Sequence, residues 1–144
     1  MKKLLICILS VFTATIVWAA SPVFEGFTLI ASNASVDYHF YGKNQSGEFV
    51  ETKGGKTVYV ISTMRVFNGK IMHGKAYVTG DDCGAKQGKI VYLSLDGSVS
   101  ERADFVSEGP SINDAVGRTI CGAAAGDIKA IKERQQKDNN DSII

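Results

Sequence analysis

Two cysteines, Cys83 and Cys121, constrain the fold of this chain more than any other feature of its sequence. They lie in the segments Thr79–Gly84 and Gly117–Gly122, whereas the third cysteine, Cys7, lies in an apolar N-terminal run. An even pair of cysteines in an exported domain predicts a disulfide bond. Free thiols or a metal site are the alternatives, but two cysteines with no histidine nearby make a poor zinc site. We therefore expect a bond between Cys83 and Cys121.

The N-terminal residues predict export. Lys2 and Lys3 form a short positive segment, and residues 4–18 follow without any charge, a length that suits a signal peptide and is too short to span a bilayer. Cleavage after Ala19 would place small or modest side chains, Val17 and Ala19, at the positions that precede the cut. An uncleaved anchor is the alternative.

This interpretation divides the chain into three parts. They are a signal peptide at residues 1–19, a single α+β domain at residues 20–126, and a short helical or disordered polar tail at residues 127–144. The two-lysine start is typical of bacteria, and Cys7 lacks the small-residue pattern that precedes a lipidated cysteine. We expect a protein that is periplasmic, secreted or at the cell surface, without a lipid anchor or a membrane span after cleavage.

The charge of the chain favours no nucleic acid and no anionic membrane as a partner. The formal net charge is +1 and includes both signal-peptide lysines, so the mature chain is close to neutral. Glycine is abundant and proline is scarce, with 15 and 2 residues respectively, which suits a compact domain made mainly of strands and loops.

Five segments have the composition of β-strands. The longest is Thr57–Phe67, rich in branched and aromatic residues, and Asn68-Gly69 after it is a favourable two-residue hairpin turn. The other segments are Phe24–Ala31, Val36–Tyr41, Lys75–Thr79 and the hairpin Lys89–Val106 around Asp96-Gly97. Together they predict an antiparallel sheet of five to six strands.

The hairpin also predicts which side chains face the core. If Leu95 pairs with Ser98, then Lys89 lies opposite Asp104. One face of the hairpin then carries the residues expected in the core, Ile90, Tyr92, Val99, Ala103 and Phe105. Because the first strand is apolar on both faces, we expect a helix to cover its second face, which carries Val91, Leu93 and Leu95.

The helix is predicted to follow directly. Gly109-Pro110 ends the strand, Ser111 is a favourable N-cap, and Asp114 lies three residues later. Apolar residues recur at helical spacing up to Ile120, and Cys121-Gly122 is the predicted end. A second helical piece is expected to begin at Asp127. We thus predict an α+β fold in which one disulfide joins the end of a strand to the end of a C-terminal helix.

This layout resembles the surface-adhesin protein E family of exported bacterial proteins. The resemblance rests on Asp82-Cys83 at a strand end, the Asp96-Gly97 hairpin, the Pro110-Ser111 helix start and the segment Thr119–Cys121. It covers about residues 24–121 and is specific only from Lys75 onward. It implies an antiparallel sheet with a C-terminal helix, binding of host or envelope proteins, and the possibility of a homodimer. The family's best-known member is a lipoprotein, whereas this chain has no lipid-attachment motif, which weakens the case for surface display.

The sequence contains no recognisable catalytic or cofactor-binding motif. His39 and His73 are the candidates for proton transfer near neutral pH, and Asp37 and His39 share one strand face. Neither histidine lies near a recognisable nucleophile, so both are interpreted as exposed structural residues. The aspartates Asp81, Asp82, Asp96 and Asp104 lack the spacing of a calcium loop. We expect no metal and no cofactor.

Aromatic residues at Tyr38, Phe40, Tyr41 and Tyr59 are predicted to lie in the core rather than on a contact surface. The sequence favours a binding module without enzymatic activity, of the adhesin-like kind, whose partner is a host matrix protein or an envelope protein. A periplasmic inhibitor or immunity protein for a secreted or envelope enzyme is the alternative, and an enzyme is the least favoured class.

Overall fold

A computed structural model describes residues 21–141, with side chains up to residue 135. The predicted signal peptide lies outside the described residues. The elements are β1 (Phe27–Asn33), a 3-10 turn (Ala34–Val36), β2 (Tyr38–Lys43), β3 (Glu48–Glu51), β4 (Thr57–Phe67), β5 (Lys70–Thr79), α1 (Gly80–Ala85), β6 (Gln87–Leu93), β7 (Val99–Val106) and α2 (Ile112–Asp141).

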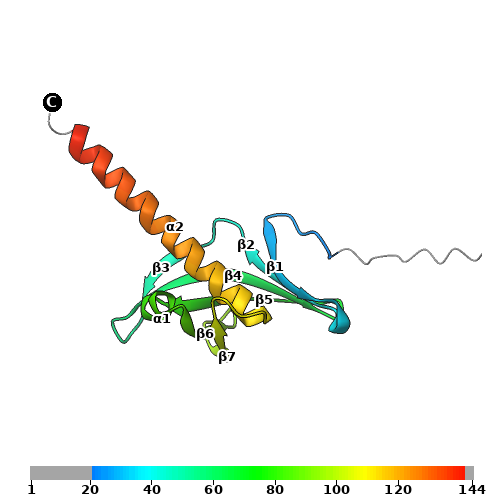
Figure 1. The fold of residues 1–144 in the computed structure, drawn as a ribbon. Coiled ribbons are helices and arrows are strands. Elements are labelled where there is room, and N and C mark those ends of the chain that lie inside the picture. Colours follow the sequence, from blue (N-terminus) through cyan, green and yellow to red (C-terminus); the bar gives the residue numbers. More distant parts are fainter. Residues whose placement is uncertain (1–20, 142–144) are drawn as a thin grey trace, which may run out of the picture.

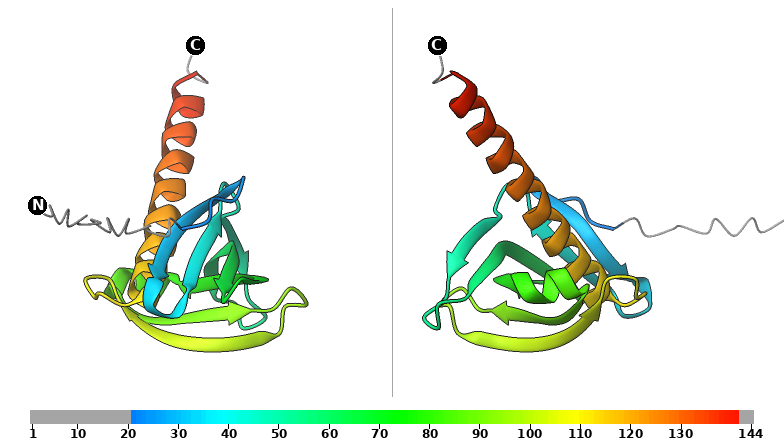
Figure 2. Two further views of the ribbon diagram at one scale, coloured as in Figure 1. Left: turned by 90° about the vertical axis from the view of Figure 1, so that its right-hand side faces the viewer. Right: turned by 60° about the vertical axis from the view of Figure 1, so that its left-hand side comes forward.

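The seven strands form one antiparallel sheet, six of them in the order β1-β2-β4-β5-β6-β7 (Figure 1). The short strand β3 pairs with the first half of β4, and β2 pairs with its second half. The sheet is strongly curved, and α1 and the first half of α2 lie on the same face of it (Figure 2). The predicted α+β fold, with an antiparallel sheet, one C-terminal helix and one disulfide, is confirmed.

The longest strand and its turn follow directly from their residues. β4 has the predicted bounds Thr57–Phe67, and all ten residues of β5 pair with it. Asn68 and Gly69 both adopt positive φ angles, of 48° and 73°. Asparagine and glycine tolerate this left-handed conformation, and it matches the twist of the two strands that the turn connects.

The main core lies between the sheet and α2. Val116, Ile120 and Ala124 recur at helical spacing on the buried side of α2. They pack against side chains from five strands, namely Phe40, Tyr59, Ile61, Ala76, Val78, Ile90, Tyr92 and Phe105. A smaller cluster of Tyr41, Met64 and Val66 lies on the opposite face, against Phe24 and Phe27. Phe40, Tyr41 and Tyr59 are therefore core residues as predicted, and Tyr38 is partly buried.

The β6–β7 hairpin has the predicted register over most of its length, but the prediction fails at its tip. Lys89 pairs with Asp104, and the two side chains form an ion pair at 2.7 Å. Between Tyr92 and Leu93 the register shifts by one residue, so Val99 pairs with Leu93. Because a one-residue shift moves a side chain to the other face, Val99 leaves the core and is 45% exposed.

The prediction that a helix covers the face of Val91, Leu93 and Leu95 is also wrong. α2 packs on the other face of β6, over Ile90 and Tyr92. That face combines with Phe40, Ile61 and Val78 into the larger apolar surface, so it offers α2 more burial. Leu95 lies in the turn beyond the strand and is exposed.

The helix start is confirmed atom by atom. The Ser111 hydroxyl accepts a hydrogen bond from the Asp114 backbone N–H at 3.1 Å, and the Asp114 carboxylate accepts one from the Ser111 N–H at 2.8 Å. The second carboxylate oxygen accepts from the Val106 N–H at 2.7 Å, which joins α2 to the end of β7. Hydrogen bonding of the carboxylate, first to the Ser111 side chain and then to the backbone N–H groups of Val106 and Ser111, lowers the pKa of Asp114.

The predicted end of the helix is wrong. α2 does not end at Cys121-Gly122 and restart at Asp127; it is one helix of 30 residues. Alanines at 123–125 continue it, and the i,i+4 pair Lys129–Glu133, at 3.8 Å, supports it further along. The part of the predicted polar tail up to Asp141 is therefore helical, and it projects away from the sheet (Figure 1).

Replacement of Asp114 by asparagine tests the cap. The ordinary carboxyl pKa is 3.8 and the folded-state pKa lies below it, so the ionised cap stabilises the fold above this pH. That contribution is lost as the pH falls through the folded-state pKa. We expect the variant to unfold at lower urea concentration than the wild type at pH 7, and the difference between the two midpoints to shrink as the pH falls below 4. A difference that is constant across this pH range would contradict the assignment.

Candidate functional site

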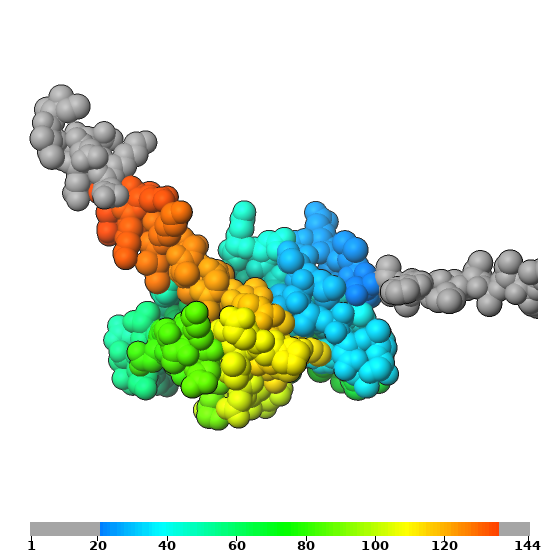
Figure 3. Space-filling view, viewed as in Figure 1, coloured from blue at the N-terminus to red at the C-terminus, as the bar shows by residue number. Residues whose placement is uncertain are grey.

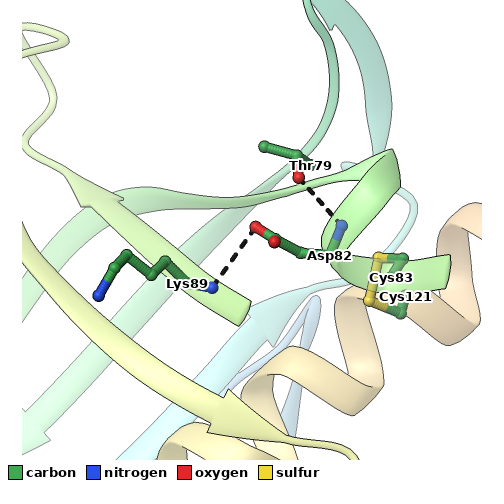
Figure 4. The surroundings of a disulfide bond; sticks show 5 residues. All are labelled: Thr79, Asp82, Cys83, Lys89 and Cys121. Atoms are coloured by element: carbon green, nitrogen blue, oxygen red, sulfur yellow. Dashed lines mark hydrogen bonds between the residues drawn. A yellow bond between two sulfur atoms is a disulfide. The ribbon is translucent and has the colours of Figure 1, made fainter. Parts of the chain in front are cut away.

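The disulfide joins the two helices rather than a strand end and a helix end. Cys83 and Cys121 are bonded, with Cα atoms 5.3 Å apart, and Cys83 lies inside α1 (Figure 4). The sequence does contain the signal for this short helix. Thr79 is its N-cap, whose hydroxyl accepts from the Asp82 N–H at 3.1 Å, and acidic residues occupy the first turn. The prediction that Cys83 ends a strand is wrong, because Thr79 is both the last residue of β5 and the N-cap of α1.

Asp82 connects this helix to the next strand. Its carboxylate accepts from the Lys89 backbone N–H at 3.4 Å (Figure 4). The other aspartates of the candidate calcium set have separate roles: Asp96 accepts from the Ser98 N–H at 2.9 Å, and Asp104 pairs with Lys89. Among residues 21–135, no three potential metal ligands come together.

The prediction that His39 is exposed is wrong, whereas His73 is exposed as expected. His39 is 7% exposed because β2 places it on the face of the smaller cluster, beside Tyr41 and opposite Val66. Its Nε2 lies 3.3 Å from the Asp37 carboxylate, and its Nδ1 is buried without a hydrogen-bond partner. Asp37 thus contacts His39 as the sequence suggested, although it precedes the strand.

Two hollows flank α2 where it leaves the sheet. The first, of about 590 Å³, lies between α2 and β1, β2 and the β2–β3 loop, and Thr28, Lys43 and Asp127 are among its polar residues. The second, of about 480 Å³, lies on the other side of α2, against α1, β3, β4 and β5. It is almost entirely apolar, and the Cys83–Cys121 disulfide forms part of its wall. Sequence reasoning identified neither hollow, because each is formed by segments that are distant in the chain.

Tyr59 lies between the two hollows and lines both of them. Its hydroxyl donates a hydrogen bond to the Asp127 carboxylate, which fixes α2 to β4 at this point. Gly47 makes room for the hydroxyl, because a Cβ atom at this position would overlap it. Burial, followed by the hydrogen bond to Asp127, raises the pKa of Tyr59 to about 12.

The chain matches no protein-family model, and no curated protein or solved structure is significantly similar to it. Along the described part of the chain, no helix combines the length and the apolar character needed to cross a bilayer.

The disulfide is expected to contribute about 4 kcal/mol to the free energy of unfolding, because it closes a loop with a sequence separation of 38 residues. We expect the Cys83→Ser/Cys121→Ser protein to lose that amount in urea denaturation, relative to oxidised protein. Both should lack residues 1–19 so that Cys7 does not contribute. Two reactive thiols in the native protein, assayed without reductant, would disprove the bond.

Replacement of Tyr59 by phenylalanine tests the link to Asp127. In a difference spectrum between wild type and variant, one tyrosine should ionise near pH 12 instead of the ordinary 10.0. Because folding raises this pKa, the bond stabilises the fold below pH 10, and its contribution is lost as the pH rises to about 12. We expect the variant to be less stable by about 1 kcal/mol at pH 8, with circular dichroism as the check that the fold persists. A midpoint near 10 in folded protein would refute the link.

Proposed function

We propose that this protein is an exported bacterial binding module without catalytic activity, and that the projecting part of α2 is its contact surface for a protein partner. The observation that supports the proposal is that the apolar stripe of α2 extends past the part of the helix that packs on the sheet. The first part of this stripe is buried against the sheet and consists of Val116, Ile120 and Ala124. The stripe continues past this packed part with Ile128 and Ile131. There they are 43% and 44% exposed.

An apolar stripe that extends past the core of its own domain is typical of a helix that binds in a groove or receives another chain. Figure 3 supports this assignment, since the coloured part of α2 nearest residue 135 stands clear of the body of the molecule. At a rise of about 1.5 Å per residue, a 30-residue helix is roughly 45 Å long, and Ala124 is the last buried residue among the α2 side chains that the structure describes. The resemblance to the surface-adhesin protein E family agrees with the proposal and remains a prediction.

Replacement of Ile131 by glutamine tests this surface. Capture of partners from envelope fractions or from host matrix and plasma proteins should identify one saturable ligand. We expect Ile131→Gln to weaken its binding about tenfold, because the loss of one buried apolar side chain at an interface costs about 1.5–3 kcal/mol. Lys129→Gln is the matched control, since it places the same residue on another side of α2, and it should bind like the wild type.

Equal binding by Ile131→Gln and wild type would contradict the proposed surface. Fractionation of the native host separates the two kinds of binding module. Protein that is accessible to protease on intact cells supports the adhesin form. Protein found only in the periplasm, bound to one enzyme, would instead establish the inhibitor or immunity form.

A further inference from the structure

The apolar hollow beside the disulfide has the properties of a small-molecule site. Its volume of about 480 Å³ lies within the range of about 300–1,000 Å³ that ligand pockets occupy. Val58 and Val78 form its buried floor, and Phe49 and Ile128, both partly exposed, lie where it meets solvent. The disulfide and the sheet hold its walls in place, so little ordering would be required on binding.

The residues that line this hollow disfavour a charged ligand group. Of its twelve residues none is ionised at neutral pH, and the hydroxyl of Tyr59 is already bonded to Asp127. A polar or charged group placed inside would lose its hydration without gaining a partner. A hydrocarbon chain has no polar group to desolvate there, and the burial of its apolar surface is favourable. Gly80 and Gly84 line its α1 side, and a Cβ atom added at either would meet no other atom within 4 Å.

A third, polar hollow adjoins the apolar one. Its volume is about 250 Å³, and it shares Thr57 and Gly80 with the apolar one. Lys56 and Asp81 line it, and neither takes part in an ion pair with any residue that the structure describes. Lys56 and Asp81 thus place one positive and one negative charge beside the apolar hollow. This pair complements a head group that carries both signs of charge.

We propose that the two hollows together bind a single-chain zwitterionic amphiphile. The hydrocarbon chain occupies the apolar hollow between α1 and α2, and the head group lies between Lys56 and Asp81. This site shares Ile128 with the proposed protein-binding surface but does not include Ile131. It goes beyond that surface, and the Ile131→Gln and Ala125→Phe variants test the two proposals separately.

The experiment is isothermal titration of lauroyl lysophosphatidylethanolamine, kept below its micelle concentration, into protein that lacks residues 1–19. We expect saturable binding of one molecule per chain. Ala125→Phe places a large side chain in the apolar hollow and should weaken binding at least about tenfold. Ala123→Phe is the matched control: it makes the same change on the same helix, but in the hollow on the other side, and should bind like wild type.

The head group is tested in two further arms. Lauric acid and dodecyltrimethylammonium, which each carry one sign of charge, should bind more weakly than the zwitterion. The Lys56→Gln/Asp81→Asn variant should lose that preference while it still binds the chain. Unchanged thermal unfolding of all variants establishes that they are folded.

Four outcomes would overturn the proposal. They are no saturable binding below the micelle concentration, equal binding by Ala125→Phe and wild type, equal weakening by the two phenylalanine variants, and no preference for the zwitterion. A fifth outcome, in which only an apolar peptide binds and is blocked by Ala125→Phe, would assign the hollow to a side chain of a protein partner and would also overturn it.

Discussion

The attachment of α2 to the sheet is the constraint on which the rest of the structure depends. Hydrogen bonds and a disulfide hold the helix at successive positions along it. The Asp114 carboxylate bonds to the end of β7, the Cys121 sulfur is joined to α1, and the Asp127 carboxylate accepts from Tyr59 of β4. Between these points Val116 and Ile120 are fully buried. The direction of the projecting half of α2 is thus set by the half that is packed.

The disulfide has a local role as well as a global one. α1 has only six residues, and it contributes Cys83 to the main core without any fully buried residue of its own. A helix this short is not stable alone, since nucleation is costly. The Thr79 cap, the contact between Asp82 and Lys89 and the bond to Cys121 together hold it against α2. The apolar hollow exists because α1 is kept in that position.

The parts of the fold that depend on local sequence were predictable. Thr57–Phe67, the Asn68-Gly69 turn and the Ser111–Asp114 cap each follow from residues that are adjacent in the chain. The errors arose where a distant contact decides the outcome. The one-residue shift at Tyr92 moved Val99 out of the core, and the choice of face for α2 depended on side chains from five strands. His39 is buried partly because β2 places it opposite Val66 of β4, a residue distant in the sequence.

The predicted end of α2 is wrong for a different reason. Gly122 predicts a stop, yet three alanines follow it and the helix continues through both Gly122 and Gly126. These small residues lie where α2 crosses a curved sheet, and they are too small to fill the space on either side of the helix. Larger side chains there would close both hollows and gain packing energy. A sequence selected only for stability would be expected to contain them. The small residues beside the disulfide therefore leave both hollows open, as the proposed ligand site requires.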